Sequence, residues 1–332
     1  MKGGGRPEPI LMVNYPSGNF PCENFLVTWF GVFGHTDHRQ SKRVEMLLWR
    51  SRVPTLPFSF SVKTFVEHFP VSKPITFRSQ THKICSKLES IISVEGSPHF
   101  KNLNSRQKEQ IHLYVDALLD WNQKMNLTAV KDATEIMGRH IEDSLAIMPP
   151  MKSCYISHCK KACDKLSLVD VGSGQGLPGL VLAIAFPGWE VTLLESMNKR
   201  CVFLEHVVDL TGLSNVQVVR GRAEDLGQNF SFREQYDIAV ARAVAEMRIL
   251  AEYCLPLVRV GGLFVAAKGH DPQLEVRNAE RAIQLMGASV LQLCSVESHS
   301  PYGQRTAVVC FKDRPTPRRY PRDPGTPAKE PL

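Results

Sequence analysis

A glycine-rich stretch that follows a short apolar run carries the clearest chemical signal in the chain. It reads Asp170-Val-Gly172-Ser-Gly174-Gln-Gly176-Leu-Pro-Gly179. Glycines at the end of a strand let the backbone turn tightly and approach a ligand, because no Cβ stands in the way. The proline suits the first turn of a following helix, where its missing N–H would be unpaired in any case. The pattern therefore predicts a ligand at the carboxyl ends of parallel strands, where the strand order reverses.

The acidic residues near this loop bear on the choice between a dinucleotide and S-adenosyl-L-methionine. The spacing of Gly174, Gly176 and Gly179 formally matches the dinucleotide fingerprint, but that match is weak on its own. Asp170 lies inside the strand end, where a ligand that bears an ammonium group benefits from a carboxylate. Glu195 closes the second predicted strand and can bind two ribose hydroxyls, which both ligands offer.

Two further observations favour the methyl donor. Ala223-Glu224 follows the third predicted strand, at the position where methyltransferases contact the adenine edge of this ligand. The last two apolar runs have no helix-length segment between them, which is typical of the terminal hairpin in that class of fold. A glycine turn that only connected a strand to a helix would not need two acids at these offsets. We therefore predict S-adenosyl-L-methionine as the cofactor.

Apolar runs and helical periods alternate through the middle of the chain, which predicts a mostly parallel α/β sheet. Seven runs have the character of strands: residues 166–171, 190–194, 216–219, 237–241, 262–267, 289–296 and 306–311. Helices are expected between them, over residues 178–186, 199–211, 246–257 and 273–286. We predict a Rossmann-like, class I methyltransferase fold with an antiparallel terminal hairpin over residues 166–312.

The segment before this domain predicts two helices. Apolar residues recur at helical spacing from Ile111 to Leu119, and Asn126-Leu-Thr ends that helix. A capping-box pattern at Asp132 starts the second helix, and Pro149-Pro150 should close it. We assign residues 96–150 to an N-terminal helical cap.

Nine cysteines lie scattered through a chain without a secretory signal pattern, which indicates reduced thiols. Cys154, Cys159 and Cys163 cluster around His158, but zinc sites usually take tighter Cys-x2-Cys pairs. We interpret residues 151–165 as a polar loop with incidental thiols and expect no metal site.

The net charge of +7 is concentrated at the two ends of the chain. Residues 1–95 carry 12 Lys and Arg against 7 Asp and Glu, and residues 312–332 carry 6 against 3. Residues 96–311 hold 22 against 23, so a nucleic-acid surface there must be a local patch. No apolar run approaches the ~20 residues that span a bilayer, so we expect no membrane partner.

The two ends of the chain have the composition of irregular segments. Between residues 46 and 87 the only acid is Glu67, against seven Lys and Arg, and serines and prolines interrupt any regular period. We predict that residues 1–95 form a transit peptide or disordered leader, with the chloroplast as the destination and the mitochondrion as the alternative. Residues 313–332 hold six prolines and are predicted to be a disordered tail.

Several linked motifs together resemble one family. In chain order they are Trp121-Asn-x-x-x-Asn-Leu-Thr128, Arg139-His140-x-x-Asp143-Ser144, the glycine loop, Glu195-Ser-x-x-Lys199-Arg200, Arg222-Ala-Glu224, Ala241-Arg242-Ala243 and Lys268-Gly269. The region from Leu103 to Lys312 is similar to the glucose-inhibited division protein B family, the bacterial 16S (small-subunit) rRNA guanine-N7 methyltransferases. The resemblance leaves out the leader, the cysteine loop and the tail, and Gln175 replaces the small residue or proline usual in the glycine loop.

The resemblance implies roles for residues on the matched motifs. The positions that match contacts to the methyl donor are Gly172, Leu177, Ala223, Glu224 and Arg242. The residues that could form a local basic patch for RNA phosphates are Arg139, His140, Lys199, Arg200 and Lys268. For Lys199 and Arg200 a solvated helix start is an alternative, and for His140 a structural hydrogen bond. Arg242, at the end of the fourth predicted strand, is expected to position the substrate.

The reaction implied by the resemblance needs no general base, because guanine N7 offers a free lone pair and loses no proton when it is methylated. The fourth strand lacks the Asn/Asp-Pro-Pro-Tyr motif typical of exocyclic-amine methylation, and Cys201 and Cys254 fall within predicted helices. The expected partner is small-subunit rRNA or the assembling small ribosomal subunit. The alternatives are a class I methyltransferase acting on a small molecule or protein, an NAD-dependent oxidoreductase, and an assembly factor without turnover.

Overall fold

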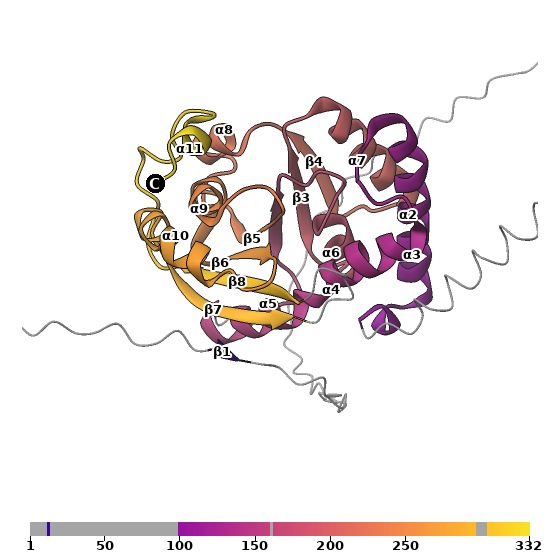
Figure 1. Ribbon diagram of the computed structural model, residues 1–332, viewed down its shortest axis with the longest axis horizontal. Coiled ribbons are helices and arrows are strands. Elements are labelled where there is room, and N and C mark those ends of the chain that lie inside the picture. Colours follow the sequence, from indigo (N-terminus) through magenta and orange to yellow (C-terminus); the bar gives the residue numbers. More distant parts are fainter. Residues whose placement is uncertain (1–11, 14–98, 160–161, 297–303) are drawn as a thin grey trace, which may run out of the picture. The chain divides into compact units, whose positions relative to one another are not determined.

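A computed structural model describes residues 12–13, 99–159, 162–296 and 304–332. Its centre is one twisted sheet with helices on both faces (Figure 1). Neighbouring strands follow the order β1, β7, β8, β6, β5, β2, β3, β4. β8 is antiparallel to both of its neighbours, and every other pair in the sheet is parallel.

All seven predicted strands are present, and the terminal hairpin is confirmed. Their bounds are β2 (Ser167–Val171), β3 (Glu190–Glu195), β4 (Val216–Arg220), β5 (Tyr236–Arg242), β6 (Val258–Lys268), β7 (Ala288–Val296) and β8 (Arg305–Lys312). The structure adds β1 (Met12–Val13), a two-residue strand within the predicted leader that pairs with β7. The rest of the predicted leader, residues 1–11 and 14–95, lies outside the described residues.

The order of the strands places a switch point beside β2. From β2 the chain moves outward to β3 and β4, and then returns to β5 on the opposite side of β2. In parallel sheets, ligands bind outside the carboxyl ends of the strands at such a switch point. The glycine-rich loop, residues 172–178, follows this strand end.

The helices fall into those of the cap and those that connect strands. The cap and the segment that follows it contain η1 (Phe100–Asn102), α2 (Ser105–Met125), α3 (Ala133–Ile136), the π-helical η2 (Met137–Glu142), α4 (Asp143–Ala146), α5 (Met148–Cys154) and the π-helical η3 (Tyr155–Cys159). The remainder are α6 (Gly179–Ala185), α7 (Asn198–Thr211), α8 (Ala223–Gln228), α9 (Met247–Cys254), α10 (Gln273–Leu285) and α11 (Thr326–Lys329). The sequence predicts neither α8 nor α11, because helices this short show no period.

Alternating strand residues divide the core into two layers. Leu168 and Ile238 point to the face that α2, α4, α6 and α7 cover. Val169 and Ala239, one residue further along the same strands, point to the face covered by α8, α9 and α10. This is the two-residue period of a strand that is buried on both sides.

The cap packs against the domain as part of its core. Asn104 and Gln107 form a reciprocal capping box at the start of α2, and Asn126 ends the helix in the left-handed region with φ 50°. The side-chain amide of Gln107 also donates to the carbonyl of Ile184 at the end of α6, at 2.9 Å. Trp121 stacks on His206 of α7 with ring centroids 5.0 Å apart. The predicted helix of residues 111–119 and its stop are confirmed.

The prediction for the segment that follows is wrong in two respects. The prolines at 149 and 150 do not end a helix but lie in the first turn of α5, where a missing N–H has no intrahelical partner to lose. The predicted cysteine loop is helical as far as Cys159, and Cys154 is buried. Among the described residues no group of three or more His, Cys, Asp or Glu is placed to hold a metal ion. Within the same ranges no helix combines the length and apolar character that a membrane crossing requires.

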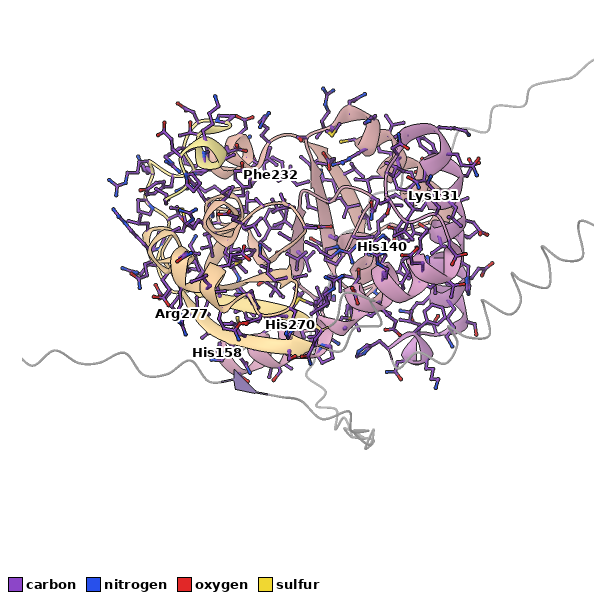
Figure 2. The ribbon with its side chains drawn as sticks, viewed as in Figure 1. Lys131, His140, His158, Phe232, His270 and Arg277 are labelled. Atoms are coloured by element: carbon purple, nitrogen blue, oxygen red, sulfur yellow. The ribbon has the colours of Figure 1, made fainter. Side chains whose placement is uncertain are left out.

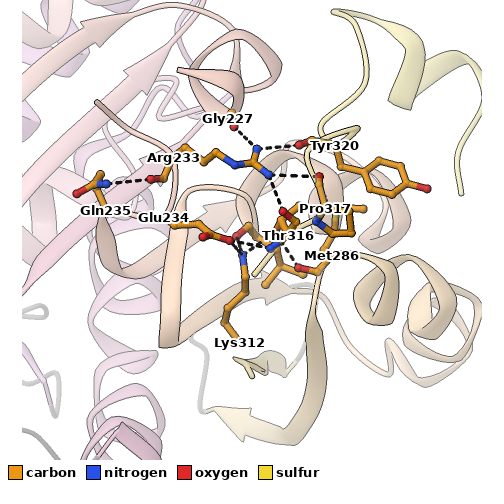
Figure 3. Close-up of polar contacts among 10 residues, drawn as sticks. Gly227, Arg233, Glu234, Gln235, Met286, Lys312, Thr316, Pro317 and Tyr320 are labelled. Carbon is orange, nitrogen blue, oxygen red and sulfur yellow. Dashed lines mark hydrogen bonds and ion pairs between the residues drawn. The ribbon is translucent and has the colours of Figure 1, made fainter. Parts of the chain in front are cut away.

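The predicted disorder of residues 313–332 is also wrong. Thr316, Tyr320 and Pro321 are buried against the domain, and α11 lies beside α8 (Figure 1). Side chains from distant parts of the chain hold this segment through its backbone carbonyls (Figure 3). Proline also lowers the entropy that the segment loses on ordering, so its proline content does not oppose a fixed structure.

Candidate cofactor and substrate site

The glycine loop has a backbone that side chains would disrupt. Gly172, Gly174 and Gly176 have φ values of 73°, 60° and 97°, in the left-handed region that favours glycine. A Cβ on Gly172 would lie 2.8 Å from Cγ2 of Val244, in the segment that follows β5. Leu177 is buried below the turn. The loop therefore presents backbone rather than side chains at the switch point, as the sequence predicts.

Asp170 lies under this loop and is fully buried. Its Oδ2 accepts a hydrogen bond from the backbone N–H of Gly179 at 2.9 Å, which ties the start of α6 to the end of β2. Its Oδ1 is also buried and has no hydrogen-bond partner among the described residues. Burial raises the pKa of this carboxyl to about 7, although the Gly179 hydrogen bond and the Arg242 charge lower it.

Glu195 links the glycine loop to the end of β3. The carboxylate is 3% exposed, and its Oε2 accepts from the N–H of Gly174 at 2.9 Å. Oε1 accepts from the N–H of Met197 at 2.8 Å, and a guanidinium nitrogen of Arg200 lies 3.5 Å from Oε2. Both acids predicted to flank the loop therefore contact it: Glu195 binds the N–H of Gly174, and Asp170 binds the N–H of Gly179 at its far end.

Ala223 and Glu224 stand in the first turn of α8, next to this arrangement. The turn before them is held by a hydrogen bond from the N–H of Gly221 to the carbonyl of Glu195, at 3.1 Å. Glu224 is 3% exposed, and its Oε1 accepts from the N–H of Gly325 at 2.9 Å. The C-terminal segment thus reaches a residue predicted to contact the methyl donor.

Tyr114 is a residue of the site that the sequence does not single out. It lies in the apolar stripe of α2 and is fully buried, but its hydroxyl donates to the carbonyl of Gln175 at 2.8 Å. The cap therefore holds the glycine loop at Gln175, next to the residue that Glu195 holds. An aromatic residue in a helical stripe predicts only core packing, so its position alone gives no signal of this contact.

Arg242 joins the end of β5 to the cap. Its Nη1 donates to the carbonyl of His140 and to Oγ of Ser144, both at 3.3 Å, and its Nη2 lies 3.5 Å from Nδ1 of His140. The two separated motifs that contain these residues thus meet at one point of the structure. The placement of His140 on the cap side of the domain is visible in Figure 2.

His140 is a neutral, hydrogen-bonded side chain in this setting. Burial and the nearby Arg242 charge lower its pKa to about 4. Its Nε2 lies 3.1 Å from Oγ1 of Thr128, and its Nδ1 faces the guanidinium donor. The arrangement favours the tautomer that carries the proton on Nε2. These contacts match the structural alternative for His140, and its contact with RNA stays a prediction.

The other residues predicted to form a basic patch have separate partners or face solvent, and their role in RNA binding stays a prediction. Arg139 pairs with Glu135 one turn earlier in the helix. Nζ of Lys268 donates to the carbonyl of Ala245 at 2.8 Å and to Glu275 at 2.6 Å, so it ties β6 to α10. Lys199 is exposed on the first turn of α7, which fits both a contact with RNA and the alternative of a solvent-exposed helix start.

Comparison with known proteins identifies relatives along most of this region. The family profile described as GidB, rRNA small subunit methyltransferase G, matches residues 107–305. The ribosomal RNA small subunit methyltransferase G of Alkaliphilus metalliredigens is 43% identical over 233 residues, which are 70% of this chain and 93% of that protein. The protein of the same name from Acetivibrio thermocellus is 41% identical over 249 residues, 74% of this chain and 97% of that protein.

These matches confirm the family resemblance drawn from the motifs. The matched residues include Tyr114, the glycine loop, both of its flanking acids and the junction of Arg242 with the cap. The relatives align over nearly their whole length, so the match covers complete proteins rather than a shared nucleotide-binding core. The chain belongs to the rRNA small subunit methyltransferase G family.

Proposed function

We propose that this protein uses S-adenosyl-L-methionine to methylate N7 of a guanine in small-subunit rRNA. The observation that carries the proposal is the family match over a loop of three left-handed glycines that lies between two buried carboxylates, Asp170 and Glu195. The names of the relatives specify a methyltransferase of small-subunit ribosomal RNA. The glycine loop supplies a place for the methyl donor.

The residues of the loop fit such a donor. The backbone of Gly172 packs so closely on Val244 that a Cβ there would clash, so only glycine lets the loop keep this course at the strand end. Oδ1 of Asp170 is an acceptor without a hydrogen-bond partner among the described residues, and an ammonium group could pair with it. Glu195 would bind the ribose hydroxyls, and Ala223 with Glu224 would contact the adenine. The bound donor supplies an electrophilic sulfonium methyl group.

The side chains beside the loop can position a base, but they are not arranged to remove a proton. Arg242 has donors only, and two residues of the cap hold its guanidinium. Nδ1 of His140 faces that guanidinium and its Nε2 faces Thr128, so neither nitrogen points away from the protein as a free base. Methylation at guanine N7 removes no proton, and it needs alignment of the reacting atoms and exclusion of water. We assign the positioning role to Arg242.

Transfer of a labelled methyl group tests this proposal. The full chain, labelled S-adenosyl-L-methionine and small-subunit rRNA that lacks the modification should together yield labelled 7-methylguanine after hydrolysis. Naked rRNA and assembled small subunits should be compared, because either can be the substrate. Label in a small molecule or a protein, with none in the rRNA, would favour a different substrate for the same fold.

We also propose that the protein acts in an organelle, with the chloroplast preferred over the mitochondrion. The support is compositional: residues 46–87 have one acid against seven basic residues, together with frequent Ser and Pro. A fluorescent reporter fused to residues 1–100 should enter chloroplasts, and a fusion to residues 46–100 tests whether Met46 is the functional start. A reporter that stays in the cytosol would contradict the organellar proposal and leave the methyltransferase proposal intact.

A further inference from the structure

The C-terminal segment, residues 313–332, runs from the amino ends of the parallel strands to their carboxyl ends. It begins after β8, whose carboxyl end lies beside the amino ends of the parallel strands because β8 is antiparallel to its neighbours. There the buried Nζ of Lys312 donates to the carbonyl of Leu255 and to Oγ1 of Thr316, both at 2.6 Å. Its final helix lies beside the first turn of α8, which follows the carboxyl end of β4 (Figure 1). The segment therefore ends near the carboxyl ends of the parallel strands, the same end of the sheet that carries the glycine loop.

Two arginine anchors hold the middle of the segment, one through backbone carbonyls and one through an ion pair. Arg233 donates from Nη1 to the carbonyls of Gly227 and Tyr320, at 2.6 and 2.8 Å, and from Nη2 to the carbonyl of Thr316 at 2.7 Å (Figure 3). Arg322 pairs with both oxygens of Glu252, at 2.9 and 2.7 Å, and its backbone N–H donates to the same carboxylate. The Glu252 side chain is 1% exposed and that of Arg322 is 23% exposed, so the pair ties a buried carboxylate to the segment by a two-point hydrogen bond.

The segment also contacts α8 directly. A Cβ on Gly227 would lie 2.7 Å from Cγ of Pro321, so the proline ring packs on the bare backbone of this helix. Three residues earlier in the same helix, the Glu224 carboxylate is 3% exposed and accepts the N–H of Gly325 at 2.9 Å. Among the described residues, the backbone N–H of Gly325 is the one hydrogen-bond donor to this carboxylate. A buried carboxylate without a donor is destabilised, so the position of Glu224 depends on the segment.

We infer that the C-terminal segment positions the Ala223–Glu224 turn for the adenine end of the methyl donor, with Arg322 and Gly325 as positioning residues. The inference rests on the proposed function, because it assumes that this turn contacts S-adenosyl-L-methionine. Neither residue touches the reacting atoms. The segment should therefore control the affinity for the donor and leave the rate at saturating donor nearly unchanged.

The main test shortens the chain so that it ends at Pro324. This removes the N–H donor to Glu224 and α11, and it keeps the anchors at Lys312, Arg233 and Arg322. Calorimetry should show that the Kd of both S-adenosyl-L-methionine and its demethylated product rises about ten-fold, as expected for a lost hydrogen bond to a buried charge. The KM for the donor should rise in parallel, whereas kcat and the KM for rRNA should change little.

A second variant, Gly227→Ala, displaces the segment without shortening it. Alanine favours a helix more than glycine does, so α8 itself should persist, while the added methyl group meets Pro321. We expect the same rise in Kd with an unchanged kcat. The matched control, Arg318→Ser with Lys329→Ser, removes two exposed charges of the segment and no anchor. Its Kd for the donor should equal that of the wild type.

The outcomes separate this inference from the proposed function. If the wild type binds the donor and both the shortened chain and Gly227→Ala bind it equally well while folded, the segment does not position the turn. A control variant that loses affinity as much as the shortened chain would also overturn the inference, because the loss of charge rather than of position would then explain the effect of shortening. If the wild type itself fails to bind the donor, the proposed function fails first.

Discussion

The glycine loop and the C-terminal segment are both irregular, both rich in Gly or Pro, and both well ordered, yet different parts of the chain hold them. The loop is fixed mainly by carboxylates at its own ends or on the adjacent strand, Asp170 and Glu195, with one more distant contact from the hydroxyl of Tyr114. The segment is fixed by side chains from α9 and from the approach to β5, such as Glu252 and Arg233. Irregular backbone needs partners for its polar groups, and these partners can be local or remote.

This difference predicts what each region controls. A change in the loop should act on ligand binding and leave the rest of the domain folded, because few groups anchor the loop. A change in the anchors of the segment should lower the stability of the face that α8 and α9 cover, since the segment lies over both helices.

The largest expected effect is that of Gly172→Asp. The new side chain must adopt a φ of 73° and enter the space beside Val244, and it adds a negative charge near Asp170 and Glu195. We expect affinity for S-adenosyl-L-methionine to fall about 100-fold, equivalent to roughly 3 kcal/mol. Gly212→Asp is the matched control, because Gly212 has a φ of 63° and a Cβ added there would meet nothing within 4 Å. Equal losses in the two variants, measured by calorimetry, would contradict the special role of the loop.

A smaller effect is expected from Arg322→Ala, and it should appear in stability. The substitution leaves the Glu252 carboxylate buried without its main partner, which should lower the free energy of unfolding by about 2 kcal/mol. Arg314→Ala is the control, since the Arg314 side chain is 66% exposed and pairs with its neighbour Asp313. Urea unfolding measures both. A loss of stability no larger than that of the control would show that the remote anchors are unimportant.

The third expected effect is a dependence of donor binding on pH. The pKa of Asp170 is raised to about 7 in the free protein, so the carboxyl is largely protonated below that pH. Because the pKa is higher in the folded protein than in the unfolded chain, protonation of Asp170 stabilises the ligand-free protein as the pH falls. An ammonium group on the donor, in contrast, pairs only with the ionised carboxylate. Affinity should therefore rise about ten-fold between pH 6 and pH 8. Asp170→Asn should bind weakly at both values, and a wild-type affinity that drops as the pH is raised over this range would contradict the pairing.

The contrast between local and remote anchors also explains how far the sequence could predict the structure. The loop, its two acids and the seven strands follow from residues that lie close together in the chain. The hydrogen bond of Tyr114 to Gln175, the junction of Arg242 with His140, and the pair of Arg322 with Glu252 join residues 61 to 102 positions apart. No period or local motif reports such contacts.

The errors in prediction have the same origin. The prolines of the tail indicate disorder only if no distant side chain supplies donors and acceptors for the backbone, and here Arg233 and Glu252 do so. The proline pair before residue 151 is compatible with a helix stop, but it equally suits the first turn of a new helix.

The most direct test of the account is a single-turnover transfer of labelled methyl from S-adenosyl-L-methionine to unmodified small-subunit rRNA, with the wild type and Gly172→Asp compared at equal concentration. The account predicts that the wild type places the label at guanine N7 and that the variant transfers far less of it at the same donor concentration. Label on an exocyclic amine, on a pyrimidine carbon or on no nucleotide at all would contradict it.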